Sequence, residues 1–164
     1  FVRRLPNPPF VLAHYHRIGR MLDRFIFGRF LQDHYFYRDR NWEQPEEVEQ
    51  AGASFSLFRR LTIDKLDYFF DEAFPLLFND VDIYRRLSDR GFLSHVVPDI
   101  QVVHLGGISS QKLGSVQYRD HLDRAVFRYF RKHHPLQYCV LAIAWPVRWL
   151  RATTREQLRG RMVM

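Results

Sequence analysis

Side chains that can transfer protons or bind divalent metals gather in residues 70–110. Residues 70–72 read Phe-Asp-Glu, residues 79–82 read Asn-Asp-Val-Asp, and His104 follows two valines and precedes Leu-Gly-Gly-Ile-Ser-Ser. A carboxylate takes a proton from a hydroxyl group only if the two lie within hydrogen-bond reach. A neutral imidazole is a suitable ligand for Mn²⁺. These residue types therefore permit acid–base or metal-assisted chemistry.

The same residues also have a structural interpretation. Asn79 is a favourable helix N-cap, and Asp82 three residues later resembles the second half of a capping box. Asp80 in the first turn would favour the helix dipole, and Asp82 with Arg86 would form an i,i+4 ion pair. A lone histidine such as His104 is usually a packing residue at the end of a strand. Residue types alone leave both interpretations open.

The elements that must position these residues can be predicted from the pattern around them. A helix should begin at Asn79 and end at Gly91, with an apolar face at Val81, Tyr84 and Leu87. Two strands, 92–97 and 100–104, should follow and meet across Pro98-Asp99. The acidic residues are thus expected at a helix start, and His104 at a strand end.

The rest of the chain predicts more helix than strand. Apolar residues at helical spacing predict helices over about 10–31 and 115–134, and a short helix over about 62–68. The aromatic-rich residues 53–58 predict a buried strand. Residues 138–150 form an apolar run with two tryptophans. The predicted fold class is α/β, with a few strands packed with helices and with amphipathic helices at the C-terminal end.

Five sequence elements occur in a fixed order: a small-residue strand ending in Arg-Arg (51–60), Phe-Asp-Glu (70–72), Phe-Asn-Asp-Val-Asp-Ile-Tyr-Arg-Arg-Leu (78–87), Gly91-Phe92, and the segment 97–110. Together they resemble the C-terminal half of family-2 glycosyltransferases, inverting enzymes with the GT-A fold, and most closely the rhamnosyltransferase-like branch. Order, spacing and most residue identities match over about residues 45–134. A single Phe-Asp-Glu would carry little weight, whereas five ordered elements are specific.

The resemblance implies roles for individual residues. Asp80 matches the general base that deprotonates the acceptor hydroxyl. His104 matches a histidine that, in many relatives, helps to hold the metal on the donor diphosphate. The resemblance places four further residues around the acceptor. Asn79 and Asp82 lie on either side of the base in the sequence, and Asp71 and Glu72 belong to the Phe-Asp-Glu turn. The turn after the histidine matches Gly106, Gly107 and Ser109.

Two positions depart from the family pattern. The family's usual Glu is Asn79 here, which leaves one carboxylate and an amide in place of an acidic pair. The glycine expected at the strand start falls on Ala53 when the Arg-Arg pair is aligned, with Gly52 beside it. A shift of one residue would exchange the two faces of that strand, so both alignments stay open.

The resemblance also implies an organisation. Residues 1–134 would be the C-terminal, acceptor-side portion of a GT-A nucleotide-diphospho-sugar transferase domain, and 135–164 an apolar and basic helical extension. The nucleotide-binding half, with the Asp-X-Asp motif that coordinates Mg²⁺ or Mn²⁺, has no counterpart in the sequence. Residues 80–82 have the Asp-X-Asp spelling but occupy the later motif. We therefore expect a piece of a longer chain that is inactive alone, in keeping with a start that has no initiator Met.

The function implied is transfer of a sugar from a nucleotide-sugar donor to a glycan or lipid-linked acceptor in cell-envelope polysaccharide synthesis. Such an enzyme would be cytoplasmic and would lie peripherally at the inner membrane face. The basic helix 115–134 and the run 138–150 would supply the membrane contact. The alternative for 138–150 is that it covers the core of the domain.

Composition and charge limit the other classes. The aromatic content (15 Phe, 8 Tyr and 3 Trp) excludes a disordered chain, and a single cysteine, Cys139, excludes a disulfide framework and a multi-cysteine zinc site. Residues 1–40 contain 8 basic and 3 acidic side chains, residues 41–100 contain 6 and 12, and residues 101–164 contain 11 and 3. Such asymmetry often reports on partners.

Two other functions remain as alternatives. A basic module without chemistry could bind an anionic membrane or nucleic acid through phosphate contacts and aromatic stacking. Nucleic acid is the less favoured ligand, because no known nucleic-acid-binding motif is present. A degenerate, transferase-like partner is the other alternative, which Asn79 supports.

Overall fold

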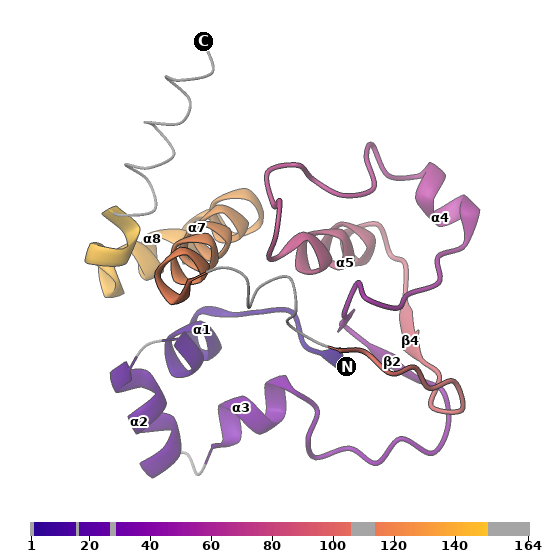
Figure 1. Cartoon of the computed structure of the whole chain (residues 1–164), viewed down its shortest axis with the longest axis horizontal. Coiled ribbons are helices and arrows are strands. Elements are labelled where there is room, and N and C mark those ends of the chain that lie inside the picture. The colour runs from indigo at the N-terminus through magenta and orange to yellow at the C-terminus, as the bar shows by residue number, and fades with distance from the viewer. Residues whose placement is uncertain (1, 16, 27–28, 106–113, 151–164) are drawn as a thin grey trace. The chain divides into compact units, whose positions relative to one another are not determined.

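The computed structural model describes residues 2–15, 17–26, 29–105 and 114–150. The chain is mixed α/β (Figure 1), and it divides into two compact units. Unit 1 comprises Phe1–Ala73 and Asn79–His104, and unit 2 comprises Phe74–Phe78 and Leu105–Met164. The strands of the described residues are short and all lie in unit 1.

Two antiparallel pairs of strands form the β-structure of unit 1. Strand β1 (Val2–Arg3) pairs with β3 (Gln50–Ala51), with Val2 opposite Ala51. Strand β2 (Glu46–Val48) pairs with β4 (Ser94–Val96), with Glu47 opposite His95 (Figure 1). Each sheet thus joins segments that are far apart in the sequence.

Three short helices follow β1. They are α1 (Pro8–Tyr15), α2 (Arg17–Phe25) and α3 (Phe30–Tyr35). The amide oxygen of Asn7 caps α1 by accepting a hydrogen bond from Phe10 N at 2.9 Å, and two prolines occupy its first turn. The chain reverses between α2 and α3, where Arg29 has a positive φ of 69° and the buried Asp23 accepts from Leu31 N at 3.1 Å.

Helix α5 (Asn79–Asp89) carries the core of unit 1, and the shorter α4 (Arg60–Asp64) precedes it. Gly91 ends α5 in the left-handed region (φ 77°), and Phe92 N donates to Leu87 O at 3.1 Å, which is a Schellman cap. Ile83, Tyr84 and Leu87 form a buried cluster. Around it pack Leu5, Ala51, Phe58, Leu66, Phe69 and Phe92.

Unit 2 is built on two helices, α7 (Ser115–His133) and α8 (Pro135–Ala144). Tyr129 and Phe130 of α7 and Leu141 of α8 are fully buried. Phe78, in the segment 74–78, packs edge to face on Tyr129 with 5.6 Å between ring centroids. Phe78 also has a positive φ of 70°, which is costly for an aromatic residue.

The structure confirms some predicted elements and corrects others. The helices predicted from Asn79 and from Ser115 are present as α5 and α7, and the strand predicted over 92–97 is present as β4. The single helix predicted over 10–31 is wrong, because the reversal at Asp23 and Arg29 divides it. The remaining corrections concern three segments. Residues 53–58 form no strand and expose Phe55 and Leu57, residues 100–104 form no strand, and the helix predicted over 62–68 is α4 at 60–64.

Within the parts of the chain that the structure describes, no helix has both the length and the apolar character needed to cross a membrane.

Candidate functional site

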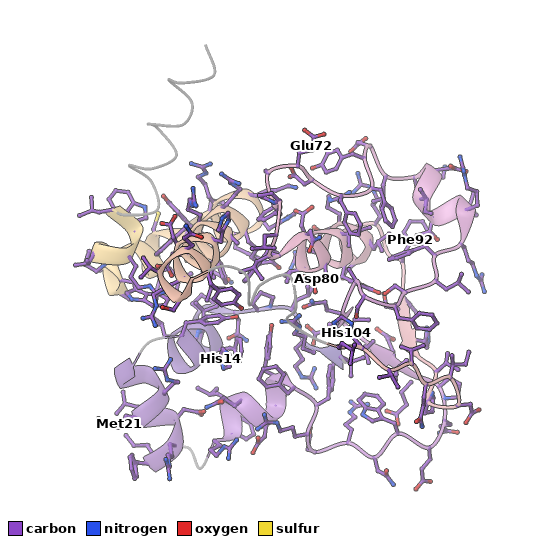
Figure 2. The ribbon with its side chains drawn as sticks, viewed as in Figure 1. His14, Met21, Glu72, Asp80, Phe92 and His104 are labelled. Carbon is purple, nitrogen blue, oxygen red and sulfur yellow. The ribbon has the colours of Figure 1, made fainter. Side chains whose placement is uncertain are left out.

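Asp80 lies in the first turn of α5, with its side chain 14% exposed (Figure 2). Its Oδ2 accepts a hydrogen bond from Arg3 Nη2 at 3.2 Å, and its Oδ1 accepts from Val81 N at 2.9 Å. An ionised carboxylate has about four lone-pair sites. The two bonds therefore fix the orientation of the group and leave acceptor capacity for a hydroxyl.

Two aromatic hydroxyls belong to the electrostatic surroundings of Asp80. Burial raises the pKa of Tyr35 to about 12; the Arg3 guanidinium opposes this shift, and the carboxylates of Asp80 and Glu49 add to it. Burial also raises the pKa of Tyr84. The hydrogen bond with Ser56 lowers this pKa, and the charge of Asp80 raises it further. Both phenols thus stay protonated at neutral pH.

Three segments meet the first half of α5, around Asp80 and Tyr84. Strand β1 brings Arg3, the end of α3 brings Tyr35, and the loop after β3 brings Ser56, whose Oγ lies 2.9 Å from Tyr84 Oη. Ser56 Oγ also donates to Gly52 O at 3.1 Å. The small-residue stretch of the family pattern is therefore joined to α5, although as a loop.

Asp82 has a different environment from Asp80. It is fully buried, and its Oδ2 accepts from Arg86 Nε at 2.8 Å. The same guanidinium donates to Tyr68 O at 2.7 Å and to Phe69 O at 2.6 Å, and it lies 4.3 Å above the Tyr68 ring. The predicted i,i+4 pair is confirmed, and it ties the backbone just before the Phe-Asp-Glu turn to α5.

The other acceptor-side residues make local contacts. Asn79 Oδ1 accepts from Asp80 N at 2.9 Å. Asp71 Oδ1 accepts from Ala73 N at 2.8 Å, which closes an Asx turn, and Tyr68 Oη lies 3.5 Å from its Oδ2. Glu72 is exposed and points outward (Figure 2). The carboxylate of Asp82, which was a candidate for a capping box with Asn79, accepts a hydrogen bond from Arg86.

His104 is exposed on the irregular chain after β4 (Figure 2). Gly106, Gly107 and Ser109, predicted as the turn behind it, lie outside the described residues. Among the residues that are described, no three His, Cys, Asp or Glu side chains form a set that could hold a metal ion. The divalent metal, whose ligands the resemblance assigns mainly to the nucleotide-binding half, stays a prediction.

Residues 138–150 have a buried face and an exposed face in the C-terminal helices. Leu141 and Trp145 are buried, so one face covers the core of unit 2. Arg148 also turns inward and donates from Nε to Asp123 Oδ2 at 2.8 Å. Every exposed residue from 135 to 150 is apolar, including the thiol-bearing Cys139. Membrane contact by this outer face stays a prediction.

Arg3 and Tyr35 were not predicted as site residues from the sequence. Arg3 lies 77 positions before its partner Asp80, so no local spacing indicates the pair. The available signals were two adjacent arginines among apolar residues in the first five positions and an aromatic residue closing α3. Neither signal identifies Asp80 as the partner.

Comparison with known proteins adds no relative. No protein-family model matches the chain, and no curated protein or solved structure matches it significantly.

Proposed function

We propose that this chain is the acceptor-side part of an inverting glycosyltransferase that uses a nucleotide-sugar donor, with Asp80 as the general base. The observation that carries the proposal is the position of Asp80. Its carboxylate lies in the first turn of α5 with 14% of the side chain exposed, where it pairs with Arg3 of β1, and Tyr84 one turn later contacts Ser56. The ordered motifs around it support the same reaction class.

The chemistry requires little of the protein beyond placement. Asp80 accepts the proton of the acceptor hydroxyl while that oxygen bonds to the anomeric carbon of the donor sugar. The bond from this carbon to the nucleoside diphosphate breaks on the opposite face, so the configuration inverts and the diphosphate leaves with the electron pair. Arg3 and Val81 N hold the carboxylate in a fixed orientation for this transfer. The acceptor class in the proposal is a glycan or a lipid-linked sugar.

The test is Asp80→Asn in the full-length protein that contains this sequence. The amide keeps the shape of the side chain but cannot take a proton, so we expect transfer to fall by about 10²- to 10⁴-fold. Released nucleoside diphosphate and glycosylated acceptor are measured with uridine, guanosine and thymidine diphosphate sugars. Asp64→Asn, at an exposed carboxylate paired with Arg60, is the matched control and should leave turnover unchanged.

Two results would contradict the proposal. Near-normal turnover by Asp80→Asn, with an unchanged circular dichroism spectrum, would remove Asp80 as the base. Failure of the unsubstituted full-length protein to transfer sugar from any of these donors would favour the non-catalytic alternatives, a basic binding module or a degenerate partner.

A further inference from the structure

The exposed side chains of α2 and of the start of α3 are apolar and cationic. Phe25 is 74% exposed, and Ile26 and Phe30 are 66% and 63% exposed. Figure 2 labels Met21 on the outer side of α2. We call this surface the α2–α3 face. Its exposed apolar side chains are Met21, Leu22, Phe25, Ile26 and Phe30.

Three arginines, Arg20, Arg24 and Arg29, are exposed among these apolar side chains. Arg24 lies over the Phe25 ring at 5.7 Å, and Arg20 donates to His14 O at 3.0 Å. None of the three forms an ion pair with a carboxylate of the described residues. The one acidic residue of α2, Asp23, is buried, where it binds Leu31 N and Gln32 Nε2.

Other arginines of the basic N-terminal segment are neutralised within unit 1. Arg3 pairs with Asp80 at 3.2 Å, Arg4 with Glu49 at 2.9 Å, and Arg40 with Glu46 at 2.5 Å. Acidic residues of the middle of the chain therefore balance part of the positive charge of residues 1–40. The α2–α3 face keeps its charge for an external partner.

We propose that the α2–α3 face docks on an anionic lipid bilayer. Burial of this face against an apolar protein surface would strip water from three guanidinium groups without supplying carboxylates, which is strongly unfavourable. A bilayer interface accepts both kinds of side chain, since phenyl and aliphatic groups enter the acyl boundary while arginines remain at the phosphates. The outer face of α8 lacks exposed cations and so does not indicate the charge of its partner.

Vesicle co-sedimentation of the full chain tests the docking. Phosphatidylcholine vesicles with about 30% phosphatidylglycerol should bind the chain at about 0.1 M salt, and pure phosphatidylcholine should bind it far less. Arg20→Gln with Arg24→Gln should weaken binding by about 10- to 30-fold, because each arginine near the surface contributes roughly a factor of five. The matched control, Arg60→Gln with Lys65→Gln, removes the same charge from exposed positions at the start of α4 and just after its end, and should have much less effect.

Apolar insertion has its own variants. Phe25→Ser should weaken binding by about tenfold, whereas Leu57→Ser, at a fully exposed leucine outside the face, should not. Phe25→Trp should add fluorescence that brominated lipids quench. Circular dichroism of each variant separates a failure to fold from a failure to bind.

Three outcomes would overturn the proposal. Equal binding to both vesicle types would remove the anionic surface as the partner. Equal losses for the arginine pair and its control would show that only total charge matters. The third outcome is that sedimentation velocity shows a dimer, which Phe25→Ser dissociates while vesicle binding stays unchanged. The α2–α3 face would then be an interface with a second copy of this chain.

Discussion

The Arg86 guanidinium donates hydrogen bonds to three groups: the buried carboxylate of Asp82 on the same helix and the backbone carbonyl oxygens of Tyr68 and Phe69. A buried ion pair of this sort adds little stability compared with an apolar pair of equal volume. Removing one partner is different, because the other charge stays buried without compensation. The pair thus acts mainly as a positional constraint on the segment that leads to Asp71 and Glu72.

Asp82→Asn should therefore lower the free energy of unfolding of unit 1 by about 3 kcal/mol, since Arg86 loses its carboxylate partner while remaining buried. Urea unfolding measures this change. Asp64→Asn removes the exposed partner of Arg60 at the same i,i+4 spacing and should cost less than about 1 kcal/mol. Similar losses for the two variants would show that the buried pair is no constraint.

Tyr35 gives a pH dependence with a defined sign. Its pKa is about 12 in the folded chain against 10.0 for an ordinary tyrosine. The folded state retains the proton that the unfolded state releases, so this contribution is complete below about pH 10 and is lost as pH rises through 12. The loss amounts to roughly 2–3 kcal/mol.

Tyr35→Phe should remove this dependence. Between about pH 9 and pH 11.5, the unfolding free energy of the unsubstituted chain should fall by more than that of Tyr35→Phe. Urea unfolding at both pH values, with phenolate absorbance to follow ionisation, is the measurement. Parallel declines for the two proteins would refute the assignment. Tyr37→Phe, at a second buried tyrosine of raised pKa, shows how far the effect is specific to Tyr35.

At the scale of elements, α5 is the best defined by its own sequence. Asn79 precedes the first-turn carboxylates, apolar residues recur at helical spacing, and Gly91 supplies the positive φ of a Schellman cap. The residue after the cap, Phe92, packs on the same cluster as Leu87. The end of the helix and the packing of its core face are therefore set together.

Gly91→Ala should destabilise the chain by about 1 kcal/mol. A Cβ at Gly91 would meet nothing within 4 Å, so the cost comes from the backbone conformation at φ 77° and not from a clash. Gly114→Ala is the control, because a Cβ there also meets nothing and φ is −59°; its effect should be below about 0.5 kcal/mol. Thermal unfolding compares the two variants. Equal effects would mean that alanine at position 91 adopts the positive φ without backbone strain.

Helices α5 and α7 could be predicted because their signals are local, namely caps and a 3.6-residue period. The strands could not be predicted to the same extent, because a strand exists only with a partner. Residues 53–58 have strand-forming residues yet expose Phe55 and Leu57 in a loop. Helical periodicity over 10–31 likewise cannot distinguish one long helix from short ones, and the carboxylate of Asp23 that organises the reversal acts through side-chain bonds.

At the scale of the whole molecule, the charge asymmetry has a mixed origin. The acidic middle of the chain and part of the basic N-terminal segment neutralise each other through pairs such as Arg4–Glu49 and Arg40–Glu46. A net charge of +7 therefore does not measure what is available to a partner. The candidate site follows the same logic, because Asp80 could be predicted from motif order whereas its partner Arg3 depends on the pairing of β1 with β3.

The exposed thiol on α8 has a practical consequence. Cys139 is the chain's single cysteine, so a maleimide dye or a nitroxide attaches at one known position without any substitution. Its neighbours on that helix surface, Leu136, Val140 and Ile143, are all exposed and apolar. A polarity-sensitive label there would report, by its emission colour, any event that withdraws this surface from water. The same accessibility makes a reducing agent necessary during storage, because two chains can join through an intermolecular disulfide.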